Sequence, residues 1–200
     1  MQALLAVVWR VPHGLDLGQA IVLPLFVTLV YAFVWSDAAE TPFPIAKVLE
    51  RFLERAWAVI VIDFLLTELG TIALTKSLSS SIVDIVTGLV AFALSVLLVF
   101  ADASATVDDD VTVWNVVPRA FVRSITAAWT STTFSRALAI YSLVLLLSAL
   151  QLAIYFAMER GHVPQAAFWS STPLLTIAVA PISALTVVVY RDARSAQSAT

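Results

Sequence analysis

The chain has 200 residues, of which 60% are hydrophobic and 12% charged, and its mean hydropathy is +0.95. Soluble domains are about half apolar and a quarter charged, and a globule of this length leaves roughly a third of its unfolded surface exposed. A soluble fold of such an apolar chain would expose much hydrocarbon to water. We therefore expect an integral membrane protein. The formal net charge of −3 disfavours nucleic acid as a partner. The absence of cysteine excludes disulfides and thiolate metal sites.

The first fourteen residues, MQALLAVVWRVPHG, lack a basic n-region and a small-residue cleavage site. We therefore expect this segment to be retained, with an interfacial helix over residues 3–11, rather than removed as a signal peptide.

A helix needs about 20 mostly apolar residues to cross a bilayer, and five windows meet that need. They cover residues 15–35, 56–75, 82–101, 137–157 and 166–190. The sequence thus predicts an all-α, polytopic helix bundle that forms one domain over residues 1–200. If the first window does not cross, four spans remain, with both chain ends on the same side.

Two connecting segments, residues 42–55 and 116–133, repeat apolar side chains at helical spacing and carry charges on the opposite face. We expect two amphipathic helices in the inner headgroup layer, with their arginines toward lipid phosphate. The alternative is that both segments simply extend the neighbouring spans. The tail, residues 191–200, is expected to be disordered.

Lysine and arginine concentrate in segments that share one side of this arrangement, which by the positive-inside rule is the cytoplasmic side. The prediction is a multi-pass protein of a prokaryotic cell membrane with its N-terminus outside and its C-terminus in the cytoplasm. The basic residues expected to face lipid headgroups are Arg51, Arg55, Arg119, Arg123, Arg191 and Arg194.

Three short motifs follow one another along the chain: the acidic stretch Val107-Asp-Asp-Asp110, the pair Arg123-Ser124 followed by Trp129, and Tyr190-Arg-Asp-Ala-Arg194. In this order, between paired spans, they resemble the membrane-domain family that includes YciC-like proteins and the membrane region of some glycerophosphodiester phosphodiesterases. The resemblance covers residues 41–194. The chain departs from the pattern by its additional first span and by lacking a glycine after the Arg-Ser helix. It implies the fold but no catalysis, because the phosphodiesterase chemistry of the fused members lies in a separate domain.

Two carboxylates, Asp63 and Glu68, interrupt the apolar run of the second span. A charged side chain at the centre of a membrane helix costs about 2.5–3.5 kcal/mol on insertion scales, so both should face protein or water. Five residues at about 100° each place them on different helix faces, which argues against a paired-carboxylate metal site. They are predicted either to make interhelical hydrogen bonds, with Gln151 among the possible partners, or to line a proton or cation path.

Other candidate sites have weaker support. Asp108, Asp109 and Asp110 lack the spacing and the glycine of a calcium loop, so we interpret them as a solvated acidic loop. His13 and His162 have no metal-ligand spacing around them. No nucleotide-binding, hydrolase or metalloprotease motif is present.

The sequence therefore predicts a non-enzymatic accessory subunit that organises or stabilises a membrane complex, without a cofactor or metal. Its expected partners are the lipid bilayer and other membrane proteins, in a homo- or hetero-oligomer. The alternative is a small transporter or channel subunit that uses the intramembrane carboxylates. An enzyme acting on lipid headgroups would need carboxylates or histidines that converge at one interface.

Overall fold

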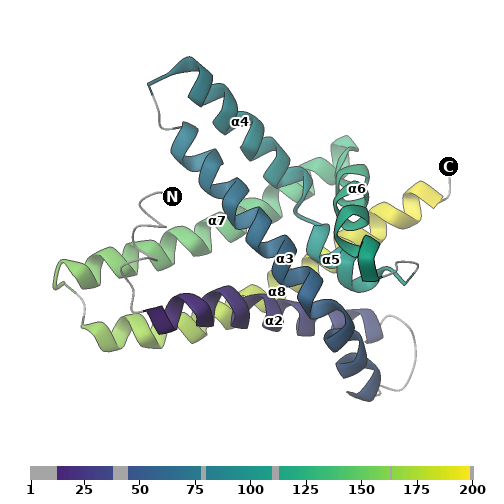
Figure 1. Cartoon of the computed structure of the whole chain (residues 1–200), viewed down its shortest axis with the longest axis horizontal. Helices are drawn as coiled ribbons and strands as arrows, with labels where there is room; N and C mark the ends of the chain where they lie inside the picture. The colour runs from purple at the N-terminus through teal and green to yellow at the C-terminus, as the bar shows by residue number, and fades with distance from the viewer. Residues whose placement is uncertain (1–12, 38–44, 78–79, 110–112, 163, 199–200) are drawn as a thin grey trace.

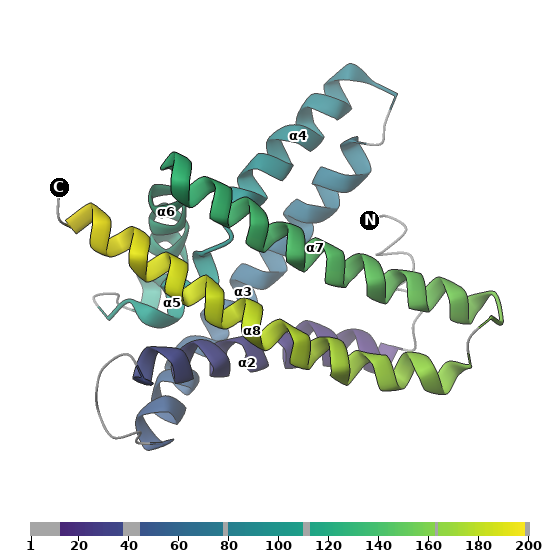
Figure 2. The same ribbon diagram turned by 180° about the vertical axis from the view of Figure 1, so that it is seen from behind.

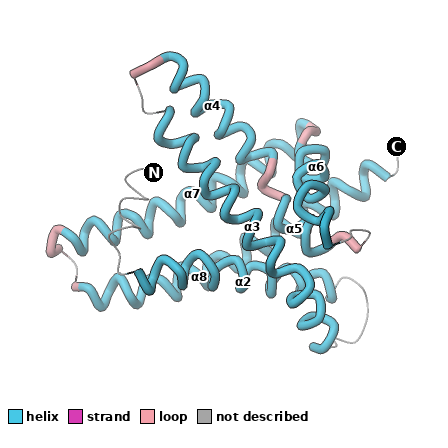
Figure 3. Tube along the Cα trace, in the orientation of Figure 1, coloured by secondary structure: helices cyan, strands magenta, loops and turns pink. Residues whose placement is uncertain are grey.

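A computed structural model of the chain describes residues 13–37, 45–77, 80–109, 113–162 and 164–198. Within these ranges the protein is helical and contains no strand (Figure 3), which confirms the predicted all-α class. The elements are α2 (His13–Asp37), α3 (Ile45–Ser77), α4 (Ile82–Leu97), α5 (Ala101–Val107), the 3-10 turn η1 (Val113–Asn115), α6 (Val116–Ala128), α7 (Ser131–Glu159) and α8 (Gln165–Ser198).

Three helical stretches among the described residues are long and apolar enough to cross a membrane: Ile45–Ser77, Ile82–Val107 and Thr132–Leu150. They correspond to the second, third and fourth predicted spans. Much of the first and last predicted spans lies where side chains are not described, so the five-span count stays a prediction.

Helix α3 runs without interruption through both the expected amphipathic segment, 42–55, and the following span. The prediction of a separate helix there is wrong where the structure describes it, from Ile45 onward. No proline or glycine stands between the two parts to end the helix. At 1.5 Å per residue its 33 residues extend about 50 Å, well beyond the 30 Å of a bilayer core. The charged half of α3 is therefore an extension of the span.

The third predicted span breaks between Leu97 and Ala101, where α4 ends and the short helix α5 begins. Ser124 of α6 stabilises the break: its hydroxyl donates to the carbonyl of Leu97 at 2.7 Å and accepts from the amide of Phe100 at 3.1 Å. A break in a helix leaves main-chain groups without intrahelical partners, and one buried hydroxyl satisfies two of them here. Both contacts join residues that lie more than twenty positions apart.

Helix α6 is separate from α7, because Trp129 and Thr130 interrupt the helix and the Thr130 hydroxyl caps the start of α7. Helical spacing predicts an apolar stripe of Val117, Phe121, Ile125 and Ala128 or Trp129 on this helix. Ala128 is buried and the first three are partly buried, whereas Trp129 is exposed. The other buried residues of the helix include the small side chains Ala120, Ser124 and Ala127.

Helix α8 continues to Ser198, so the prediction of a disordered tail is wrong for the described residues 191–198. Packing explains the order. Ala193 is buried, the guanidinium of Arg191 donates to the carbonyl of Trp35 at 3.3 Å, and the side-chain amide of Gln197 donates to the carbonyl of Thr126 at 2.8 Å. The polar composition of this segment does not reveal such contacts.

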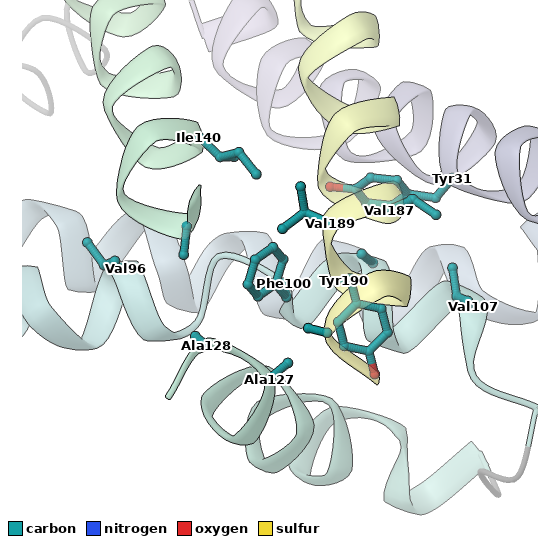
Figure 4. Packing of buried hydrophobic residues seen from close by; sticks show 13 residues of the cluster. Tyr31, Val96, Phe100, Val107, Ala127, Ala128, Ile140, Val187, Val189 and Tyr190 are labelled. Atoms are coloured by element: carbon teal, nitrogen blue, oxygen red, sulfur yellow. The ribbon is translucent and has the colours of Figure 1, made fainter. Parts of the chain in front are cut away.

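Two helical hairpins, α3–α4 and α7–α8, extend in different directions from a region around α5 and α6 (Figures 1 and 2). We call this region the base. Helix α2 lies beside α3 and α8. The α7–α8 tip turns through Gly161, whose φ of +72° suits a residue without a side chain. At the base, Phe100 and Tyr190 lie within a buried cluster that draws residues from α2, α4, α5, α6, α7 and α8 (Figure 4).

Helices α3 and α4 approach closely at their tip, where Gly88 faces Ser77. A Cβ at position 88 would lie 2.4 Å from both the main-chain nitrogen and the hydroxyl of Ser77. Lys76 and Asp84 add an ion pair of 2.9 Å beside this contact. Main-chain atoms cannot move as a side-chain end can, so only glycine permits this approach.

We predict that Gly88→Ala separates the tip of the α3–α4 hairpin and lowers the free energy of unfolding by about 1–3 kcal/mol, the usual cost of overpacking. Reversible unfolding in mixed micelles measures the change. Thr87→Ala is the matched control, because Thr87 is exposed and its hydroxyl bonds only within its own helix. Equal stability of the two variants would contradict the described packing.

Candidate functional site

One carboxylate oxygen at the base of the bundle contacts polar side chains from three helices. Oδ2 of Asp108, just after α5, accepts hydrogen bonds from the Tyr190 hydroxyl at 2.6 Å and from the Ser104 hydroxyl at 2.7 Å. Nη1 of Arg123 on α6 lies 2.9 Å from the same oxygen. The N–H bonds of that nitrogen are not aligned with an acceptor, so the contact is an ion pair rather than a hydrogen bond. We call these four residues the Asp108 hub.

Arg51 joins α3 to the same place through the main chain. Its Nε donates to the carbonyl of Thr106 at 2.6 Å, and its Nη2 donates to the carbonyl of Asp108 at 2.9 Å and pairs with the carboxylate of Asp109 at 2.7 Å. The last carbonyls of a helix lack intrahelical partners, and a cation there also suits the helix dipole. Arg51 therefore caps the C-terminal end of α5.

Trp35 brings the end of α2 to the base. The guanidinium of Arg51 lies 5.0 Å from the centre of the Trp35 ring, within the range of a cation–π contact. The carbonyl of Trp35 accepts a hydrogen bond from Arg191 of α8. Arginines from α3 and α8 thus hold α2 from two sides.

The structure revises the expected role of several basic residues. Arg51 and Arg55 are only 7% and 6% exposed, so their side chains face protein rather than lipid phosphate. Arg123 is largely buried in the Asp108 hub. A single sequence shows that these arginines lie beside apolar residues, but not that the acidic loop after α5 contacts Arg51 and Arg123.

Three of the predicted headgroup-facing arginines keep access to the surface. Arg119 and Arg194 are exposed, and Arg191 is partly buried by its contact with α2. Arg119 and Arg123 line a shallow groove with Pro118 and Val122. For these residues the predicted headgroup contact stays a prediction.

Asp63 and Glu68 lie on different faces of α3, as their spacing requires. Asp63 is partly buried and Glu68 is exposed. The side chain of Gln151 lies outside the described part, and the buried hydroxyl of Ser95 on α4 donates to the carbonyl of Ala91 in its own helix.

A second carboxylate, Asp102 of α5, lies close enough to Asp63 for their charges to interact. Tyr31 of α2 lies near both carboxylates, and the side chains of Ser183 and Thr186 on α8 lie beside its hydroxyl. The sequence did not single out Asp102, because it follows directly on the expected end of the third span. A prediction that the third apolar helix continues past residue 101 would have placed Asp102 inside the bundle.

Metal ligation has little support among the described residues, where no three His, Cys, Asp or Glu side chains lie together in a way that could hold a metal ion. His162 is exposed at the α7–α8 tip. Asp110 lies outside the described ranges.

No family model matches the chain, and no curated protein or solved structure matches it either. The resemblance to the YciC-like membrane-domain family therefore stays a prediction. The three motifs on which it rests do meet in the structure: Asp108 contacts both Arg123 and Tyr190, and Ser124 fills the break before α5.

The Asp108 hub joins three helices at one oxygen, which accepts two hydrogen bonds and forms one ion pair. Such a network stabilises a fold when it is complete and is costly when it is broken. The arrangement is best suited to fixing where α5, α6 and α8 sit relative to one another.

We predict that Asp108→Asn and Arg123→Gln each lower the free energy of unfolding by about 3 kcal/mol, because each leaves a largely buried partner without its counter-charge. The double variant should lose less than the sum, since the two changes remove the same contact. Equilibrium unfolding of all four proteins measures the coupling.

Arg136→Gln is the matched control. Arg136 and Asp192 also form an arginine–aspartate pair, but at 3.8 Å and with both side chains more than half exposed. Such a pair contributes less than about 1 kcal/mol. Additive losses at Asp108 and Arg123, or an equal loss at Arg136, would show that the hub does not hold the base together.

Proposed function

We propose that this protein is a non-enzymatic accessory subunit of a prokaryotic cell membrane, which packs against other membrane proteins and stabilises their assembly. The observation that carries the proposal is that polar and apolar side chains lie in different parts of the protein. The polar groups of the base bond to one another, whereas the hairpins present apolar side chains outward. In the most apolar windows of the three candidate spans, only 17–25% of the residues are buried within the chain.

Helix α4 offers the surface that best suits a partner helix. Val83, Val86 and Val90 follow one another at helical spacing and are 73%, 54% and 54% exposed. The tip of the α3–α4 hairpin extends away from α7 and α8 (Figure 1), and within the described part of the chain these valines stay exposed. Helices in a membrane associate by close van der Waals packing, for which short, stiff valine side chains are suited.

The proposed topology has five crossings, with the base in the cytoplasmic headgroup region and the N-terminal side outside. The course of the chain supports it: α2, α3, α4 with α5, α7 and α8 run alternately toward and away from the base (Figures 1 and 2). Arg51, Arg123 and Arg191 all lie at the base, on the side that the positive-inside rule assigns to the cytoplasm.

The test is purification of the protein from its native membrane in mild detergent, with the assembly mass and the stoichiometry of every co-purifying protein. We predict a fixed complex, with a second protein or a second copy, whose yield drops in the triple variant Val83→Ala, Val86→Ala, Val90→Ala. Removing methyl groups from a packed face costs contacts that lipid does not replace.

The matched control is Leu143→Ala, Leu146→Ala, Leu150→Ala on α7, a face with the same spacing and comparable exposure. It should leave the complex intact. A wild-type protein that purifies as a monomer without a partner would contradict the accessory role. An equal loss of the complex in both triple variants would contradict the choice of the α4 face.

A specific observation favours a second candidate, a proton or cation path, because Asp63 has a carboxylate neighbour inside the bundle. In that case Glu68 takes no part, since it is exposed on another face of α3. Ion flux into liposomes that contain the purified protein separates this candidate from the accessory role.

A further inference from the structure

Small side chains bring the two inner carboxylates together. Ala101 and Ala105 of α5 pack in one buried cluster with Ala58 and Ile62 of α3. Asp102 follows Ala101 and Asp63 follows Ile62, so each aspartate stands at the edge of this contact. Alanine allows two helices to approach closely, and the charge of Asp63 acts on Asp102 beside this contact.

Within the described part of the chain, neither carboxylate has a counter-charge. Among the described residues no ion pair joins Asp63 or Asp102 to a lysine or an arginine. Oδ1 of Asp102 is out of contact with solvent and has no hydrogen-bond partner in that part of the chain. A buried carboxylate oxygen normally accepts hydrogen bonds or binds a cation. The unpartnered oxygen is therefore the feature that needs an explanation.

The groups on the helices packed around the pair do not supply the missing charge. Helix α2 contributes the hydroxyl of Tyr31, and α8 contributes Ser183 and Thr186, which lie beside that hydroxyl. The other charged groups on these helices are engaged or exposed elsewhere. Arg51, Arg123 and Arg191 are bound at the base, and Asp84 pairs with Lys76 at the tip. Arg55 lies two helical turns before Asp63 along α3. The exposed groups are Glu54, Glu68, Arg119, Asp192 and Arg194.

We propose that Asp63 and Asp102 form a binding site for one small monovalent cation, H⁺ or Na⁺, with the Tyr31 hydroxyl beside it. Two negative charges close together in a medium of low dielectric repel strongly, and one positive charge between them removes most of that cost. A proton would be shared as a hydrogen bond between the two carboxyl groups. Sodium would take oxygen ligands from the same groups.

The site is independent of the accessory role, because it would be occupied whether or not the protein binds a partner or conducts ions. The two tests can therefore fail separately. Loss of a co-purifying partner concerns the α4 face, whereas cation binding concerns Asp63 and Asp102 in the isolated chain.

The experiment is the thermal unfolding of the purified protein in lipid nanodiscs as the pH is raised, in choline chloride and in sodium chloride. The bound cation stabilises only the folded state. In choline chloride the midpoint should fall as rising pH removes the shared proton and leaves two charges inside. If the site takes sodium, sodium chloride should restore the midpoint at high pH; if it takes only a proton, the two salts should agree.

Asp63→Asn and Asp102→Asn are near-isosteric and remove one charge each, so both should abolish the sodium dependence and reduce the pH dependence to that of a single buried carboxylate. Glu68→Gln is the matched control on the same helix and should behave as wild type. Infrared spectra of wild type labelled at aspartate provide a second readout that needs no variant. At a pH where the midpoint is high, a protonated carboxyl band or a sodium-dependent carboxylate shift is expected. A midpoint independent of pH and sodium, with only ionised carboxylates in the spectrum, would overturn the proposal.

Discussion

Three polar side chains from three helices converge on one oxygen of Asp108, and the position of the other elements depends on this convergence. Ser104 of α5 and Tyr190 of α8 donate hydrogen bonds, and Arg123 of α6 forms an ion pair. Since a largely buried carboxylate must be compensated, the helices that carry these side chains cannot separate without leaving it unpaired. Arg51 extends the same constraint to α3 by capping α5, and its contact with Trp35 extends it to α2.

The base explains how hairpins with so little mutual contact keep their places. Away from α5 and α6, the α3–α4 hairpin is held by the close approach at Gly88, by the pair of Lys76 with Asp84 and by the contact of α3 with α2. Many of its other side chains, such as Phe64, Ile72 and Leu89, are apolar and exposed. In a bilayer such a surface is at no disadvantage, because lipid tails solvate it as well as another helix does. Specific association with a partner then depends on shape.

The sequence predicted the elements that depend on local composition. The all-helical class, the second to fourth apolar stretches and the separation of 116–128 from the next span follow from hydropathy and helical period, which are local properties. The break at Leu98–Phe100 could not be predicted, because that stretch holds no proline or glycine and the groups that satisfy the break come from Ser124.

The candidate sites show the same limit. Asp63 was predicted to face protein or water, and its side chain is partly buried. Its neighbour Asp102 was missed because its place depends on the continuation of the third span beyond residue 101. Arg51 and Arg55 were assigned to lipid headgroups because amphipathic spacing does not distinguish a headgroup layer from an acidic loop of the same chain. Such partners are properties of the tertiary structure.

The central claim is that the base and the two hairpin tips lie at opposite membrane surfaces. The chain has no cysteine, so single cysteines report their side without interference. The measurement is labelling of cysteines at Ser80, His162, Asn115 and Ser195, all exposed positions, with an impermeant reagent applied to intact cells. The proposed topology predicts that cysteines in place of Ser80 and His162 react from outside. Cysteines in place of Asn115 and Ser195 should react only after the membrane is opened. Reaction of Ser80 and Ser195 from the same side would contradict it.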